Sequence, residues 1–228
     1  MKKPGGPTAV GALLSFNGGF VDTAGFLGLQ GLFTAHVTGN FVTLGAALVY
    51  GHHGIIGKIL ALPVFIVVIA LARFAGAALR ARKAPVLRVF LGVEVALLFL
   101  FFALAVTFGP FDDADSPAAL LTGFAGIAAM ALQNALHRVH LANLPPTTLM
   151  TGSTTQVTID AVDLISGADP EHAAAIRTRF GRLSLSILYF AAGCAASAAL
   201  YWYAGFWCLG LAVIVGAAAA LIRADEAA

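Results

Sequence analysis

The residues best suited to binding a polar solute form two similar turns in an otherwise apolar chain. The first turn lies in FTAHVTGNFVTLGAAL, residues 33–48, and the second lies in TTLMTGSTTQVTIDAV, residues 147–162. In each stretch a Thr-Gly pair precedes a short apolar run. Threonine is a good helix N-cap, and glycine permits a sharp turn or the close approach of a ligand. Because helix N-termini attract anionic or electron-rich groups, we expect the two turns to form one binding site.

The predicted site also includes polar residues upstream of each turn. A helix that starts near the middle of a membrane points its free N–H groups into the protein, beside these residues. The candidate substrate-binding residues are Asn17, Asp22, His36, Thr38, Gly39 and Asn40 in the first half of the chain and Gln133, Asn134, Thr151, Gly152 and Ser153 in the second. The alternative is that Thr38 and Thr151 only cap short helices and help to pack them.

Asp22 is the candidate for proton coupling. It lies in the first long apolar run, where an unpaired carboxylate costs at least a few kcal/mol. It could exchange a proton during transport, bind a cationic or hydroxylated part of a substrate, or accept structural hydrogen bonds from the neighbouring turn. The matching position in the second half is the neutral Asn134, which favours a single coupling ion. His36 could act as a gate or as a proton partner of Asp22, although a single loop histidine is more often simply hydrogen-bonded.

Arg73 and Glu94 are predicted to form a structural ion pair. By helical rise, each lies roughly 10 Å from the same membrane boundary, on consecutive apolar segments. Opposite charges in a membrane interior are expected to neutralise each other, so we favour pairing over a role in substrate binding. A further acid, Asp160, could line a vestibule near the second turn.

The composition is that of an integral membrane protein. The chain has 228 residues, of which 60% are hydrophobic and only 11% charged, and its mean hydropathy is +0.91. Apolar runs of about 20 residues can cross a bilayer as helices, whereas the strands of a membrane barrel are shorter and alternate in polarity. The basic residues, which give a formal charge of +2, lie mainly in short loops, so we expect no nucleic-acid partner.

We predict an all-α polytopic membrane protein with six transmembrane helices and two short re-entrant helices. The long segments cover about residues 8–30, 57–80, 86–109, 118–138, 181–203 and 206–222, and the short ones cover about 38–50 and 151–166. If all eight segments cross, the basic residues in loops divide seven to five between the two sides. If the short segments turn back, eleven of the 13 lie inside, Lys58 lies outside and Arg73 lies within a span. The second arrangement fits the positive-inside rule and places both termini in the cytoplasm.

This arrangement implies an inverted-topology internal repeat. Three crossings and one re-entrant helix in each half place the second half upside down relative to the first, as in many transporters. Asp22 precedes Thr38 by nearly the same distance as Asn134 precedes Thr151. We therefore expect one transmembrane domain made of two repeats, residues 1–110 and 111–228.

The motifs GGFVDTAGF, FTAHVTGNFV, MALQNA and TTLMTG together resemble the YoaK family of bacterial inner-membrane proteins, a domain of unknown function. The resemblance covers essentially the whole chain. It implies a multi-pass protein of the bacterial inner membrane and suggests transport of small metabolites, without naming a substrate. One departure lies in the second turn, whose polar residue is Ser153, whereas the first turn has Asn40.

We expect a secondary transporter of a small polar solute, anionic metabolites included, in which one repeat rocks against the other around the Thr-Gly turns. Two alternatives remain open: a passive channel of the same architecture, and a membrane scaffold or sensor that transports nothing. The sequence has no nucleotide-binding loop, zinc motif or GxSxG elbow, so we expect no enzyme activity, no cofactor and no metal site. The expected partners are a small-molecule substrate and membrane lipid, and small-residue faces such as Gly193 with Ser197 would allow a homodimer.

Overall fold

The computed structural model describes residues 6–51, 54–167 and 169–226. The structure is 83% helix, and the described residues form no strand. The elements are α1 (Gly6–Gly28), η1 (Val37–Gly39), α2 (Asn40–Tyr50), α3 (Ile55–Ala81), α4 (Val86–Phe108), α5 (Pro117–His140), α6 (Thr151–Ile165), α7 (Pro170–Ala204), η2 (Gly205–Cys208) and α8 (Leu209–Glu226). The all-helical class predicted from the sequence is confirmed.

Five helical stretches in the described part of the chain are long and apolar enough to cross a membrane. They are Ala9–Gly28, Ile55–Ala81, Val86–Phe108, Pro117–His140 and Glu171–Ile222. The last stretch contains both α7 and α8, joined by η2, and has 52 residues, whereas one crossing needs only about 20. The apolar helix Val37–Tyr50 is shorter, and α6 has 15 residues. These lengths and compositions support a membrane protein.

The loop between α4 and α5 shows how local sequence positions the helices. Ser116 is the N-cap of α5, and its Oγ accepts a hydrogen bond from the N–H of Ala119 at 3.3 Å. The adjacent Asp115 accepts hydrogen bonds from the N–H groups of Ile55 and Gly57, at 2.9 and 3.1 Å. One acidic loop therefore fixes the start of α5 and ties it to the start of α3.

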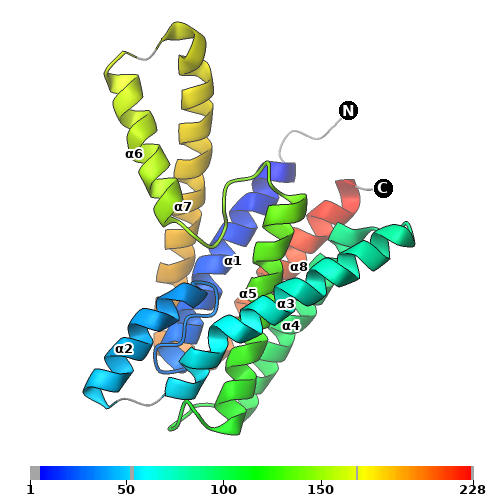
Figure 1. Ribbon diagram of the computed structural model, residues 1–228, viewed down its shortest axis with the longest axis vertical. Helices are drawn as coiled ribbons and strands as arrows, with labels where there is room; N and C mark the ends of the chain where they lie inside the picture. The colour runs from blue at the N-terminus through cyan, green and yellow to red at the C-terminus, as the bar shows by residue number, and fades with distance from the viewer. Residues whose placement is uncertain (1–5, 52–53, 168, 227–228) are drawn as a thin grey trace.

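The helices pack as a bundle with two projecting parts. Helix α1 packs against α7 and α8, α4 packs against α5 and α8, and α3 crosses α5. Helix α2 packs against α3, and α6 packs against α7. Figure 1 shows α6 and the first part of α7 extending away from the bundle as a hairpin, while α2 lies beside the bundle near its opposite end. The start of α1, the end of α8 and the α3–α4 turn lie on the same side of the bundle.

The two short helices, α2 and α6, begin part-way along the bundle. Figure 1 shows the loop after α1 turning back before α2 begins, and α2 then returning to the end of the molecule that α1 had reached. The loop after α5 turns back in the same manner, and α6 returns toward the opposite end. Both loops therefore bring polar residues from the ends of the bundle toward its middle.

Candidate functional site

The carboxylate of Asp22 on α1 holds the loop that leads to the first turn. Its Oδ1 accepts hydrogen bonds from the backbone N–H groups of Thr34 at 2.8 Å, Ala35 at 2.7 Å and His36 at 3.3 Å. The Asp22 side chain is buried, with 6% of its surface exposed. Three donors on one oxygen match the structural alternative, because hydrogen bonds to a charged acceptor stabilise a buried carboxylate. This geometry supports a positioning role for Asp22.

Two neutral amides on α5 hold the loop that leads to the second turn. The Thr148 hydroxyl donates a hydrogen bond to Asn134 Oδ1 at 2.8 Å. Gln133 Nε2 donates to Thr147 Oγ1 at 2.9 Å and to the backbone carbonyl of Leu14 on α1 at 3.0 Å. The second half thus anchors its loop at the matching place, with amide groups where the first half has a carboxylate.

Close contacts between loops and helices show that both loops pass beside α1. A Cβ atom added to Gly18 would collide with the backbone carbonyl of Thr147 in the second loop. A Cβ added to Gly25 on α1 or Gly126 on α5 would lie 2.7 or 3.0 Å from the Thr34 methyl group of the first loop. Glycine at these positions is what permits the loops to reach the middle of the bundle. The sequence-predicted polar turns are therefore brought close to the same two helices.

Neither threonine of the Thr-Gly turns caps a helix, which corrects the expectation from the sequence. Thr38 lies inside η1, so α2 begins only at Asn40, and its N-cap is Gly39 without a side-chain hydrogen bond. Thr151 is the first residue of α6, and the N-cap there is Met150. A side chain caps only from the position before the helix, and both threonines lie beyond that position.

Asn40 closes the first turn instead. Its Oδ1 accepts a hydrogen bond from the Phe33 N–H at 2.8 Å, and its Nδ2 donates to the Phe33 carbonyl at 2.9 Å. His36 and Thr38 are exposed and Gly39 is half-buried. The His36 ring lies against Phe33, with centroids 5.7 Å apart. The first turn is therefore a closed loop that presents His36 and Thr38 at its surface.

The second turn is more open. Thr151 and Gly152 are exposed, whereas Ser153 is buried with its hydroxyl unpartnered among the described residues. A pocket beside this turn is lined by a hydroxyl-bearing face of α6, of which only Thr151 was predicted as a site residue. That face consists of Thr151, Thr154, Thr155 and Thr158.

Several buried polar side chains in the bundle have no hydrogen-bond partner among the described residues. They include both side-chain atoms of Asn17, both carboxylate oxygens of Glu94 and Oε1 of Gln133. Each of these residues is at most 1% exposed. The Asn17 amide faces the contact between α4 and α8, since a Cβ added to Gly216 of α8 would lie 3.6 Å from Asn17 Nδ2 and 2.9 Å from Leu98 Cδ1 on α4. These groups lie inside an apolar bundle, and no polar atom of the described residues satisfies them.

Arg73 and Glu94 are not brought together, contrary to the expected ion pair. Both oxygens of Glu94 are unpartnered, and Arg73 is exposed. The physical reason is the packing order: α3 crosses α5 and makes only a slight contact with α4, which carries Glu94. Consecutive helices in the sequence are not the closest neighbours in this bundle.

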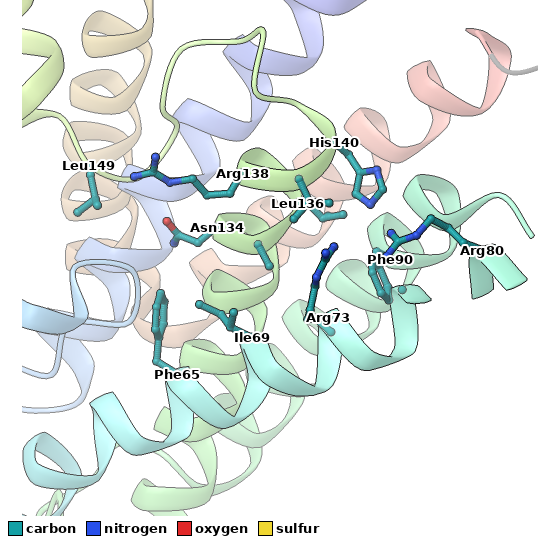
Figure 2. A pocket seen from close by; sticks show the side chains of 14 residues that line it. Phe65, Ile69, Arg73, Arg80, Phe90, Asn134, Leu136, Arg138, His140 and Leu149 are labelled. Atoms are coloured by element: carbon teal, nitrogen blue, oxygen red, sulfur yellow. The ribbon is translucent and has the colours of Figure 1, made fainter. Parts of the chain in front are cut away.

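Arg73 instead lines a cavity of about 330 Å³ between α3, α4, α5 and the second loop. Figure 2 shows Arg73 and Arg80 on α3 near His140 on α5, with Asn134 and Arg138 farther along α5. The rest of the lining is apolar and has no Asp or Glu. The complete lining is Phe65, Ile69, Ala72, Arg73, Gly76, Arg80, Phe90, Asn134, Ala135, Leu136, Arg138, Val139, His140 and Leu149.

The cationic cluster in this cavity was missed by the sequence reasoning. Two signals for it were present: Arg73 and Arg80 are seven residues apart, which places them on one helix face, and α5 ends in the basic run HRVH. What the sequence did not reveal is that α3 crosses α5, which brings the two sets together.

Asp160 pairs with Arg179 on the α6–α7 hairpin rather than lining a vestibule. Arg179 Nη2 donates to Asp160 Oδ1 at 2.6 Å, and Gln156 Nε2 donates to the same oxygen at 2.8 Å. The hydrogen bond from Arg179 is the main cause that lowers the pKa of the Asp160 carboxyl, against the opposing effect of burial. This pair ties the projecting hairpin together.

No group of three His, Cys, Asp or Glu side chains in the described ranges is arranged to hold a metal ion. Comparison with known proteins gives one match. A family described as a protein of unknown function (DUF1275) matches residues 10–222. No match was found among curated proteins or among solved structures.

Proposed function

The chain belongs to the DUF1275 family, which agrees with its resemblance to the YoaK family, and we propose that it transports a small polar solute across the membrane. The proposal places substrate binding between α1, α4 and α5, beside the two polar loops. We propose further that the protein has no enzyme activity and no resident cofactor. The bacterial inner membrane, with both termini in the cytoplasm, is the proposed location.

The observation that carries this proposal is the set of buried, unpartnered polar groups of Asn17, Gln133 and Glu94. Buried polar groups in proteins are nearly always hydrogen-bonded, and leaving one unpaired costs about 1–3 kcal/mol. In a membrane interior such groups usually mark a solute or proton path. A polar solute bound beside them would satisfy the donors and acceptors that the protein leaves open.

The helix pairings support an inverted repeat of residues 1–110 and 111–228. If α1 to α4 correspond in order to α5 to α8, the α1–α7 contact matches α5–α3, the α1–α8 contact matches α5–α4, and α2–α3 matches α6–α7. The opposite directions of α2 and α6 in Figure 1 agree with two re-entrant helices that enter from opposite sides. Six crossings then remain, with α7 and α8 as separate spans.

In an alternating-access cycle, the two corresponding contacts α1–α7 and α3–α5 would exchange their tight and open packing. Helices α1 and α7 meet closely through Gly19 and Gly193, whereas α3 and α5 enclose the cavity that contains Asn134. In the proposed cycle the first contact opens as the second one closes.

Glu94 is a better coupling group than Asp22. Asp22 Oδ1 is engaged by three backbone N–H groups, whereas both oxygens of Glu94 are free of hydrogen bonds within the described ranges. A carboxyl group that exchanges a proton during a cycle needs at least one conformation in which no fixed donor holds it. We therefore assign proton coupling to Glu94 and loop positioning to Asp22.

The first test is the melting temperature of the detergent-purified protein with a panel of carboxylates, phosphate esters, sugars and amines. A ligand that binds only the folded state raises this temperature. We expect Asn17→Ala to weaken the affinity for any compound found by roughly tenfold. Ser197→Ala is the matched control, because Ser197 is also buried and unpartnered but lies on α7. Equal losses in both variants would argue against a site at Asn17.

The second test is uptake of that compound into proteoliposomes under a pH gradient. Glu94→Gln should remove the dependence of uptake on the gradient, and Asp22→Asn should keep it. Flux that only follows the solute gradient would favour a channel. Binding without any flux would contradict transport.

A further inference from the structure

The cavity between α3, α4 and α5 has the chemistry of a site for an anionic amphiphile. We propose that it binds the phosphate headgroup of a membrane phospholipid that carries net negative charge, with part of an acyl chain in the apolar section. This inference concerns a lipid site and holds whether or not the protein transports a solute.

Two guanidinium groups lie beside a histidine at this cavity, whose lining has no Asp or Glu. Arg73 and Arg80 come from α3 and lie near His140 of α5, whereas Arg138 of α5 points to the other side of the cavity, toward Leu149. All three arginines are exposed, and none has a hydrogen bond or ion pair among the described residues. Like charges that share a cavity repel each other, and an anion between them removes the repulsion.

Two guanidinium groups and a histidine from two helices suit a phosphate in particular. A guanidinium donates parallel hydrogen bonds to two oxygens of one phosphate, and groups arriving from different sides engage different oxygens. Because Arg73 and Arg80 belong to α3 and His140 to α5, a phosphate bound between them would also link α3 to α5.

The apolar part of the cavity favours an amphiphile over a free ion. Phe65, Ile69 and Leu149 line the section away from Arg80 and His140, as Figure 2 shows. Helix α3 also carries exposed apolar side chains next in sequence to residues of the lining, namely Ile66 and Phe74, at 57% and 75% exposure. An acyl chain would lie along this surface and bury apolar area that a free phosphate would leave uncovered.

The position along α3 agrees with a headgroup at the membrane surface. Arg80 lies one residue before the end of α3 at Ala81, and Arg73 lies about two turns earlier. The start of α1 and the end of α8 lie on the same side of the bundle as the basic α3–α4 turn. Basic pockets between transmembrane helices at the cytoplasmic surface are suited to anionic lipid headgroups.

The test measures lipid retention and thermal stability with defined lipids. The purified protein is mixed with phosphatidylglycerol, with zwitterionic phosphatidylcholine or with inorganic phosphate, and bound lipid is counted by native mass spectrometry. We expect phosphatidylglycerol to be retained and to raise the melting temperature, and phosphatidylcholine to do so far less. Arg73→Gln and Arg80→Gln should each reduce retention at least about threefold. Arg177→Gln, an exposed arginine of α7 outside the cavity, is the matched control.

A second variant tests the site without removing charge. Ile69→Phe fills the apolar section, so it should reduce retention of phosphatidylglycerol while all three arginines remain. Equal retention of both lipids, or an equal loss in Arg177→Gln, would overturn the proposal. A thermal shift from inorganic phosphate as large as that from phosphatidylglycerol would overturn the assignment to a lipid.

Discussion

The α1–α7 contact and the α3–α5 contact occupy corresponding places in the proposed repeats, yet they are packed in opposite ways. A Cβ atom added to Gly193 of α7 would collide with the Phe16 carbonyl of α1, so these two backbones nearly touch. The α3–α5 contact instead surrounds a cavity of about 330 Å³ lined by arginines. Tightly packed backbones resist sliding, whereas helices separated by a cavity can shift. In the proposed transport cycle, α3–α5 is therefore the contact that we expect to shift first.

The loops differ between the two halves in a related way. The loop after α1 is held by the carboxylate of Asp22, and the loop after α5 by the neutral side chains of Gln133 and Asn134. Asp22 Oδ1 accepts hydrogen bonds from three backbone N–H groups, whereas Gln133 and Asn134 each make one hydrogen bond to a threonine hydroxyl of the second loop. The first loop is therefore held more firmly than the second. Its anchor, Asp22, belongs to α1, the helix that also makes the tight contact with α7.

The largest effect is expected from Gly193→Ala, which attacks the tight contact directly. The added methyl group meets backbone rather than a flexible side chain, so α1 and α7 must separate. We expect the free energy of unfolding in detergent to fall by about 4 kcal/mol or more. Gly181→Ala on the same helix is the control, because a Cβ there meets nothing within 4 Å. That variant should gain about 0.5–1 kcal/mol from helix propensity. Similar stability for the two variants would refute the close contact.

A smaller effect is expected when the two loop anchors are removed. Asp22→Ala leaves the N–H groups of Thr34 and Ala35 without their acceptor and should cost about 3 kcal/mol. Asn134→Ala removes one hydrogen bond from the Thr148 hydroxyl and should cost about 1 kcal/mol. The measurement is again unfolding in detergent. Hydrogen exchange of residues 34–36 should increase only in the first variant, and an equal cost for both would remove the distinction between the loops.

The fold class and the location of the polar loops were predictable from particular residues. Apolar runs of membrane-spanning length fixed the helical class, since backbone groups in lipid need internal partners. The Asp22 position, ahead of FTAHVTGN, correctly placed a polar group beside the first turn, and structural bonding to that turn was one of the open alternatives. The pairing of Gln133 and Asn134 with the second turn follows the same logic.

The side-chain partners were less predictable, because they depend on which helices touch. Arg73 and Glu94 are at suitable depths for an ion pair, but α3 crosses α5 and leaves α4 to pack with α5 and α8. The same crossing creates the arginine cluster, whose members come from residues that are far apart in the sequence. The depth of a side chain in the membrane can be estimated by counting residues along its helix. Which side chains it contacts depends on how the helices pack, and this the sequence does not show.

The smallest effect concerns the departure between the two turns. Asn40 makes two hydrogen bonds to the backbone of Phe33, whereas the Ser153 hydroxyl at the matching place has no partner among the described residues. Asn40→Ser should therefore cost about 1–2 kcal/mol of unfolding free energy. Ser153→Ala should not lower the unfolding free energy, because it removes no hydrogen bond made by the described residues. A buried hydroxyl without a partner does not stabilise the fold, so a role for it would lie in binding a ligand.

The binding test compares Ser153→Ala with Asn17→Ala. If Ser153→Ala does not lower stability but weakens the binding of a compound that also depends on Asn17, the second turn belongs to the binding site. Unchanged binding in that variant would confine the site to α1, α4 and α5, and a marked loss of stability would show that the hydroxyl is structural.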